Sequence, residues 1–328
     1  MRAVVIALPE GKIEGQASWT VPDHFRYLWM LKDGEFLLRT PDGLEQGDRK
    51  LEMKPLPRLP GQLLSVALNP GQEIMVTTSK ESAPQSQTAG ASGASPMTAA
   101  RLTPGGETSG EQSDLVVRVI QRPSDRVLQT QRVHSAFNEP MNAEGYVALS
   151  SAKKYVWKLT LKSFDGGSKV LSIVDSGCPP NLGFITDREL FLTTCTPEGG
   201  LRLAGLSTGG HTFWATDAPP EPVWPLLVMS PDGSRLAREA LVLKNSVDLK
   251  KHPKFVEAVK GQVVRVIDAA NGKVVFEAPL TPILDGGGNV AFSPSGRRFA
   301  ILSGGAIQVF DLPPAAPTPD LSKDGSAH

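Results

Sequence analysis

Two cysteines form the pattern in this sequence that comes nearest to chemistry. Cys178 and Cys195 flank a predicted β-hairpin over residues 182–194. If a tight turn is centred on 186–187, antiparallel pairing places position 178 directly opposite 195, and directly opposed residues can be close enough for a disulfide. A turn one residue later would lose this register, and Pro179-Pro180 can bend the strand away. Two interpretations stay open: a disulfide, which favours an oxidising compartment, or two reduced cysteines that pack as small hydrophobic side chains.

Other residue types that could catalyse reactions or bind metals show no supporting spacing. The five histidines are scattered at His24, His134, His211, His252 and His328. None forms a His-x-x-x-His pair or lies within a few residues of a cysteine, so no zinc site is predicted. The glycines at 286–288 enter a predicted strand rather than a helix, which argues against a phosphate-binding loop. One Gly-x-Ser-x-Gly match occurs, at Gly205-Leu-Ser-Thr-Gly209, but it joins two predicted strands, whereas the nucleophile elbow of a serine hydrolase leads from a strand into a helix. We therefore predict no catalytic residue, no metal and no cofactor.

A small basic cluster is the only charged group that suggests a partner. Lys250, Lys251, His252 and Lys254 lie together on a predicted insertion loop. Such a cluster is either an ordinary solvated loop or a docking site for an acidic partner.

Composition narrows the class of partner further. Lys plus Arg and Asp plus Glu both number 34, so the formal net charge is zero. A strong positive field that would attract nucleic acid is therefore absent, and no apolar run has the roughly 18 residues that a transmembrane helix needs. The apolar start 1–8 is cut short by Pro9, which indicates a β-strand rather than a signal peptide. Localisation depends on the cysteines: secreted or periplasmic if they form a disulfide and the true start lies upstream, and cytoplasmic otherwise.

A repeated sequence pattern identifies the β-strands that must position these residues. An apolar strand, a turn containing Pro and Gly, and a second strand occur at 227–236, at 290–299 and in a shorter form at 66–74. The unit beginning at 227 continues after an insertion with a third strand that ends in Asp268-Ala-Ala-Asn-Gly-Lys273, and a fourth strand follows. Turns of the Asx-Gly kind are strong hairpin signals. The sequence thus predicts units of four antiparallel strands.

The motif Ser-Pro-Asp-Gly-Ser-Arg-Leu-Ala, from Ser230, and the third-strand motif resemble the blades of WD40-like and YVTN-like β-propellers. The Trp-Asp dipeptide typical of eukaryotic WD40 repeats is missing, which favours a bacterial array. The resemblance implies an all-β fold, a β-propeller of six or seven four-stranded blades over residues 1–312. Because 3–8 resembles a third strand, the chain opens in the middle of a unit. Either that strand is spare, or the protein is N-terminally truncated in this sequence.

Three segments interrupt the repeat. Residues 81–113 are rich in Ser, Gly, Ala, Thr and Gln and are predicted to be disordered. Residues 245–260 form a predicted loop insertion that could include a short helix, and 313–328 form a predicted disordered Pro-rich tail.

The function expected from this fold is binding. Propellers present loops on a rigid ring, so we expect a non-catalytic scaffold that binds a protein or a small ligand at one face. The alternative is an enzyme with a site at the mouth of a propeller channel, quinoprotein-like or glycosidase-like, because single residues from distant blades can converge there without any motif.

Overall fold

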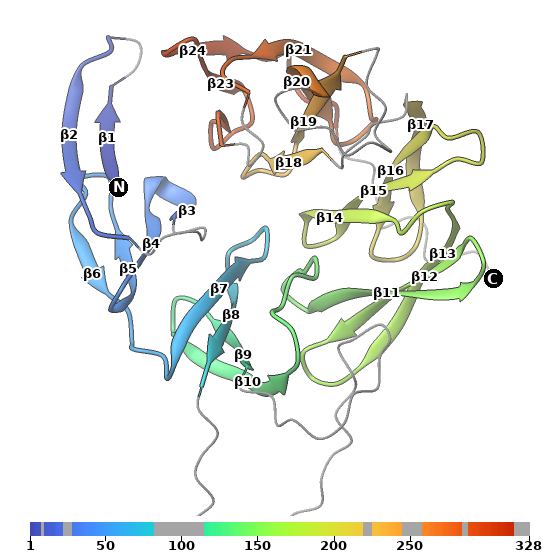
Figure 1. The fold of residues 1–328 in the computed structure, drawn as a ribbon, viewed down its shortest axis with the longest axis horizontal. Helices are drawn as coiled ribbons and strands as arrows, with labels where there is room; N and C mark the ends of the chain where they lie inside the picture. The colour runs from blue at the N-terminus through green and yellow to red at the C-terminus, as the bar shows by residue number, and fades with distance from the viewer. Residues whose placement is uncertain are drawn as a thin grey trace, which may run out of the picture. The chain divides into compact units, whose positions relative to one another are not determined.

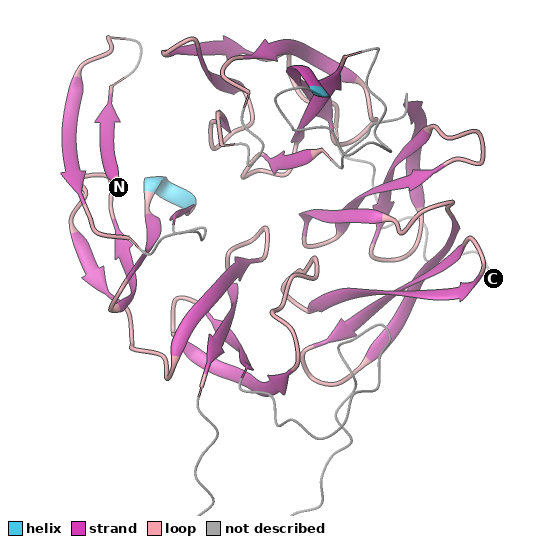
Figure 2. Ribbon diagram, viewed as in Figure 1, coloured by secondary structure: helices cyan, strands magenta, loops and turns pink. Residues whose placement is uncertain are grey.

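The computed structural model describes residues 1–7, 10–21, 28–81, 115–218, 225–244, 258–283 and 288–317. The chain divides into two compact units, unit 1 (Met1–Glu139) and unit 2 (Pro140–His328), and each is considered by itself below. Figure 2 shows that strands make up nearly all of the regular structure in both. No helix of the described residues is long and apolar enough to cross a membrane.

Unit 1 holds three antiparallel sheets (Figure 1, blue to green). A hairpin pairs β1 (Arg2–Ile6) with β2 (Ile13–Ser18). The next two sheets have four strands each. They are built from β3 (Leu28–Met30), β4 (Phe36–Thr40), β5 (Gly43–Gly47) and β6 (Met53–Pro55), and from β7 (Gln62–Leu68), β8 (Ile74–Lys80), β9 (Leu115–Gln121) and β10 (Arg126–Val133).

Unit 2 holds four more antiparallel sheets (Figure 1, green to red). The first consists of β11 (Gly145–Lys153), β12 (Val156–Ser163) and β13 (Ser168–Asp175). The second consists of β14 (Asn181–Thr186), β15 (Glu189–Cys195), β16 (Leu201–Ser207) and β17 (Thr212–Ala218). The third consists of β18 (Leu226–Met229), β19 (Arg235–Leu243), β20 (Val259–Asp268) and β21 (Val274–Leu280). The fourth consists of β22 (Val290–Phe292), β23 (Arg298–Ser303) and β24 (Ala306–Asp311).

The predicted fold class is confirmed. Strands that are consecutive in sequence pair side by side in every sheet, and this succession of up-and-down sheets is the succession of blades in a β-propeller. Among the described residues, six sheets have three or four strands and therefore count as six blades. The expectation of four strands in every blade holds for four of the six blades among the described residues. Sheets β11–β13 and β22–β24 have three described strands, and in the first of them a single bridge between Met141 and Tyr146 stands where a first strand would be.

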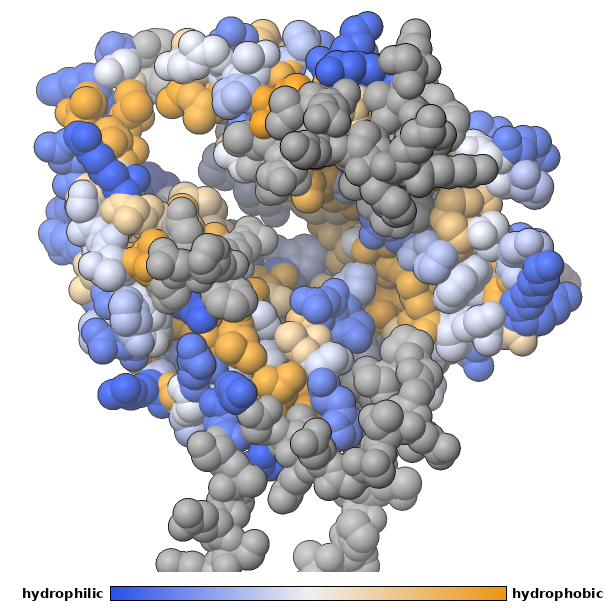
Figure 3. Space-filling view, in the orientation of Figure 1, coloured by the Kyte–Doolittle hydropathy of each residue, from blue (hydrophilic) through white to orange (hydrophobic). Residues whose placement is uncertain are grey.

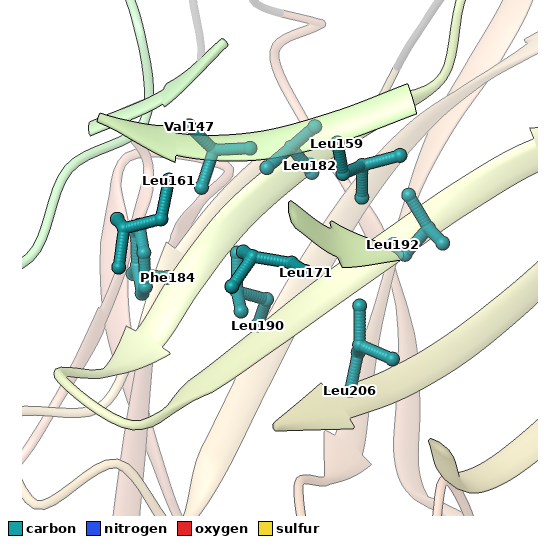
Figure 4. Close-up of a cluster of buried hydrophobic side chains, with 9 residues drawn as sticks. All are labelled: Val147, Leu159, Leu161, Leu171, Leu182, Phe184, Leu190, Leu192 and Leu206. Atoms are coloured by element: carbon teal, nitrogen blue, oxygen red, sulfur yellow. The ribbon is translucent and has the colours of Figure 1, made fainter. Parts of the chain in front are cut away.

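The core of each unit lies between neighbouring sheets. In Figure 4, Val147, Leu159 and Leu161 of sheet β11–β13 face Leu182 and Leu190 of sheet β14–β17. Each of these side chains is buried, and burial of one such side chain contributes about 1.5–3 kcal/mol. Figure 3 shows the complementary distribution in unit 2, with hydrophilic residues along the outer margin of β11–β17 on the right of the view.

Strands in the middle of unit 2 are buried on both faces. On β19, Ala237 packs toward Val264 and the sheet β22–β24, whereas Leu236 packs with Ile267 toward the sheet β14–β17. Such strands lose the alternation of polar and apolar residues that a half-exposed strand shows. This double burial explains why the alternation in the sequence is imperfect.

The repeated hairpin has the same hydrogen bonds in each of its three copies. The residue before the proline donates its N–H to the carbonyl five positions on, and its side-chain oxygen accepts the N–H of that same residue. The pairs are Asn69 with Ile74, Ser230 with Arg235, and Ser293 with Arg298. The side chain therefore closes the turn from within, as Asn and Ser commonly do.

The three interrupting segments are described only at their ends. Residues 82–113 and 245–257 lie outside the described residues. Val259 and Lys260 belong to β20, so the predicted insertion ends before the expected position. Of the predicted tail, 313–317 is described and contacts the sheet β18–β21, because Arg235 Nη2 donates to Pro313 O at 2.5 Å. The remainder, 318–328, lies outside the described residues.

Candidate functional site

In unit 2, the first turns of successive sheets contact one another in chain order. Asn142 Nδ2 donates to Asp187 O, and Ala143 N donates to Asp187 Oδ1, both at 2.8 Å. These bonds join the turn before β11 to the turn between β14 and β15. We call the surface formed by the turns at 142–145, 186–189, 230–235 and 293–298 the turn face of unit 2.

Two glycines allow the remaining turns to approach. Gly233 and Gly296 have φ of +72° and +62°, a conformation that favours glycine. A Cβ on Gly233 would lie 2.3 Å from Thr186 Cγ2, and a Cβ on Gly296 would lie 2.4 Å from Ser234 Oγ. The four turns therefore form one continuous row, in which a Cβ at either glycine would force the facing side chain to shift.

A second set of hydrogen bonds holds each turn of this row to its own sheet. In each sheet of unit 2, one backbone N–H that lies just after β12 or β16, or at or near the end of β20 or β24, donates to a carbonyl of the first turn at 2.8–3.0 Å. The bonds run from Phe164 to Glu144, from Thr208 to Arg188, from Ala269 to Ser234 and from Leu312 to Arg297. The row is thus held both along its length and from beneath, so a partner would meet a preorganised surface.

The turn face carries exposed charges of both signs. Glu144, Arg188, Asp232 and Arg297 are exposed, and they come from four different turns. The Asp232 carboxylate is engaged within its own turn, since Oδ1 accepts from Ser230 Oγ at 2.6 Å and from the Ser234 N–H at 3.1 Å. Mixed charges on a rigid surface suit recognition of a polar protein surface rather than of a nucleic acid backbone.

A buried ion pair lies beneath the turn face. Arg235 opens β19, Asp268 ends β20, and the two are direct partners in the register. Arg235 Nη1 is 2.5 Å from Asp268 Oδ2, and their side chains are only 1% and 4% exposed. Asp268 also accepts the N–H groups of Ala270 at 3.1 Å and of Ala316 at 2.9 Å. The pair ties the third sheet of unit 2 to the segment that follows β24.

Two further carboxyl groups of unit 2 are buried without an arginine. Burial raises the pKa of Glu189, and a hydrogen bond from Thr186 opposes that shift. Burial likewise raises the pKa of Glu239, which receives a 3.5 Å hydrogen bond from Gln262 Nε2. Glu239 Oε1 has no hydrogen-bond partner among the described residues. Within that part of the chain, no group of three or more His, Cys, Asp or Glu residues could hold a metal ion.

The two cysteines lie at the end of the sheets opposite the turn face. Cys178 and Cys195 are joined by a disulfide, with Cα atoms 5.5 Å apart. The register argument for their proximity was nevertheless wrong. The turn occupies 187–188, and Asn181 pairs with Thr193, so continuing the register would place 178 opposite 196.

A loop rather than a strand brings the cysteines together. Ser176 Oγ donates to Cys178 O at 2.6 Å and accepts the Cys195 N–H at 3.0 Å. Gly177 N donates to Cys195 O at 3.0 Å. The segment before Pro179 thus folds over the end of β15, independently of the hairpin register.

The remaining predicted site residues cannot be placed. Lys250, Lys251, His252 and Lys254 lie outside the described residues, as do His24 and His328. The two described histidines, His134 and His211, are both exposed. His211 lies in the turn after β16, where its N–H donates to Ser207 Oγ at 3.0 Å.

Sequence reasoning missed the turn face and the ion pair beneath it. A sequence signal for the pair exists. The repeated hairpins at 227–236 and 290–299 both place an arginine five residues after the turn serine, and in both sheets an aspartate ends the third strand. The contacts of Asn142 and Gly233 with neighbouring turns have no local signal. They depend on how consecutive sheets pack.

Comparison with known proteins yields fold-level similarity alone. A functionally unknown protein from Desulfotomaculum acetoxidans aligns with 13% identity and a TM-score of 0.49, over 94% of this chain and 89% of that one. Hsv2 from Kluyveromyces lactis aligns with 11% identity and a TM-score of 0.47, over 87% of this chain and 75% of that one. The WD40 domain of SCAP from fission yeast aligns with 11% identity and a TM-score of 0.38, over 87% and 65% of the two chains. No protein-family model and no curated protein matches the sequence. We draw no functional conclusion from similarities at this level.

Proposed function

We propose that this protein is a non-catalytic propeller of the WD40-like or YVTN-like type that serves as a protein-interaction scaffold, and that the turn face of unit 2 binds the partner. The observation that carries the proposal is the continuous row of four turns, each held to the next by a hydrogen bond or by glycine contact. A preorganised surface loses little conformational entropy on binding, so its exposed charges can act through complementarity.

The enzyme alternative receives less support. The buried carboxyl groups of Glu189 and Glu239 belong to two different sheets. Perturbed pKa values mark catalytic sites when they occur together in a cleft with nucleophiles or bases. A docking role for the loop with Lys250, Lys251, His252 and Lys254 stays a separate part of the proposal, for an acidic partner.

The test compares two charge-reversal variants with equal net charge change. The first changes the turn face at Glu144→Lys, Arg188→Glu and Arg297→Glu. The matched control changes the opposite end of the sheets at Lys153→Glu, Glu198→Lys and Arg202→Glu. All six residues are exposed, so both variants are expected to fold.

The readout is quantitative affinity capture from the native source with wild type and both variants. We expect the turn-face variant to lose proteins that wild type and the control both retain. Identical sets of retained proteins for both variants would contradict the assignment of this face.

A further inference from the structure

Unit 1 contains a pocket of about 310 Å³ between the β4–β5 hairpin and the segment that enters β7. Its lining includes Arg39, Thr40, Asp42, Arg58, Leu59 and Leu63. This volume is at the lower end of the range for small-molecule sites, about 300–1,000 Å³. All of its lining residues belong to unit 1, and none belongs to the turn face of unit 2.

Arg39, one of the residues that line the pocket, is a buried arginine. Arg39 is 4% exposed, and its Nη1 donates to Leu64 O at 3.0 Å while its Nη2 donates to Leu63 O. The two carbonyls lie where the pairing of β7 with β8 shifts register between Leu63 and Ser65. These contacts fix the guanidinium in place, and burial lowers the pKa of Arg39 because the charged form is desolvated. A positive charge held in this way at a pocket wall attracts an anion.

A hydroxyl in the same wall lacks a hydrogen bond. Thr40 Oγ1 is buried and has no partner among the described residues. An unsatisfied buried hydroxyl costs free energy, which an acceptor or donor from a bound molecule would recover. Thr40 is itself one of the residues that line the pocket.

The lining defines the charge and polarity of the ligand. Two arginines and one aspartate, Arg39, Arg58 and Asp42, give a net charge of +1, which suits a monoanion. Leucine side chains at 44, 59 and 63 supply an apolar wall beside these groups. A carboxylate attached to a short apolar body meets both requirements, since the exposed Arg58 can bind a carboxylate through paired N–H groups while the buried Arg39 contributes a fixed positive charge.

We propose that this pocket binds the carboxylate of a small amphiphilic molecule. The source of that carboxylate is either a free organic acid or the C-terminus of a peptide. Both place one carboxylate against Arg39 and Arg58 and an apolar group against Leu59.

The experiment uses the full chain and ligand-observed NMR. The probes are hexanoate, its neutral analogue hexanamide, and N-acetyl-Ala-Leu with a free or an amidated C-terminus. We expect hexanoate to bind and hexanamide to bind at least about tenfold more weakly, because a hydrogen bond to a charged group is lost. Tighter binding of the free-acid peptide than of hexanoate would identify a peptide C-terminus as the source. The reverse order would identify a free acid.

Matched variants separate binding from folding. Thr40→Val should weaken hexanoate binding about tenfold, whereas Thr77→Val, which removes a buried hydroxyl of the same kind outside the pocket, should leave binding unchanged. Arg58→Ala should weaken binding about threefold, and Arg126→Ala should not. Leu59→Trp should fill the pocket and abolish binding.

The proposal is overturned by any of three results: no binding of hexanoate or of the free-acid peptide, equal binding of hexanoate and hexanamide, or equal effects of Thr40→Val and Thr77→Val on affinity. Thermal unfolding of every variant shows that each compared protein is folded.

Discussion

Two arginine–aspartate pairs occupy the same position in consecutive sheets of unit 2, yet their surroundings differ completely. Arg235 and Asp268 are 1% and 4% exposed, whereas Arg298 and Asp311 are 62% and 85% exposed. In both sheets the arginine opens the second strand and the aspartate ends the third, and the two residues are register partners. The difference comes from what lies above them, because Pro313 and Ala316 cover the first pair.

The comparison shows that two ion pairs with the same strand register can contribute very differently to the free energy of unfolding. An exposed ion pair contributes little, about 0–1 kcal/mol, because water and salt screen it. A buried pair is different, since removing one partner leaves an uncompensated charge in the interior. The same motif therefore has a strong structural role in one sheet and a weak role in the next.

The largest expected effect is at the buried pair. Asp268→Asn leaves Arg235 buried without its counter-charge and should lower the free energy of unfolding by about 3–5 kcal/mol. Asp311→Asn is the matched change in the next sheet and should cost about 1 kcal/mol or less. Urea unfolding of both variants measures the difference, and equal losses would show that burial does not distinguish the pairs.

The next effect concerns the disulfide, which holds the end of the sheets opposite the buried pair. Replacing both Cys178 and Cys195 by serine should cost about 3 kcal/mol, because a cross-link spanning 17 residues restricts the unfolded chain. Urea unfolding in the same conditions allows direct comparison with Asp268→Asn. Intact mass after alkylation, with and without prior reduction, tests the bond itself. Alkylation of both thiols without reduction would contradict it.

The turn serines extend the comparison to an uncharged group. Ser230→Ala removes the acceptor for the Arg235 N–H at a 2% exposed site, and a loss of about 1–2 kcal/mol is expected. Ser293→Ala removes the equivalent bond to Arg298 at a more exposed site, where water can replace it, so a loss of about 0.5 kcal/mol is expected. Thermal unfolding with van't Hoff analysis resolves the two, and a larger loss at Ser293 would reverse the burial argument.

The last prediction concerns a buried acid that has no arginine. Burial raises the pKa of Glu239 above its ordinary value of 4.5, so the folded state favours the neutral carboxyl. The unfolded chain releases this proton first, and stability should therefore fall as pH rises from about 4.5 through the folded pKa. Glu239→Gln should remove that fall, giving a variant that is more stable than wild type at pH 7 and similar to it at pH 4. If the difference in free energy of unfolding between wild type and Glu239→Gln does not change with pH, this prediction is wrong.

Several particular features could be predicted from the sequence. The hairpins at 230–235 and 293–298 formed as predicted because their turn residues supply local hydrogen bonds and positive φ. The hairpin between β14 and β15 was also correctly located. Its turn was misplaced by one residue, because Thr186, Asp187 and Arg188 have no glycine or proline that would determine the central pair. The sequence therefore located a turn correctly only where proline, glycine and a side-chain hydrogen-bond acceptor occur together.

The candidate site was much less predictable. Nothing near Asn142 in the sequence indicates that it bonds to Asp187, which is 45 residues away. The pocket at Arg39 is likewise formed by two segments about 20 residues apart. Both depend on the packing of one sheet against the next, which local patterns do not encode.

The amino-acid sequence by itself determined the repeated hairpins and their turns that contain proline, because these depend on short-range hydrogen bonds and on strand register. Only the tertiary structure decided which arginine–aspartate pair is buried, which turns form one surface and how Cys178 reaches Cys195. The physical reason is that the burial of a residue depends on which residues surround it in space, and these can be far away in the sequence. For Arg235 those neighbours include Pro313, 78 residues further along the chain.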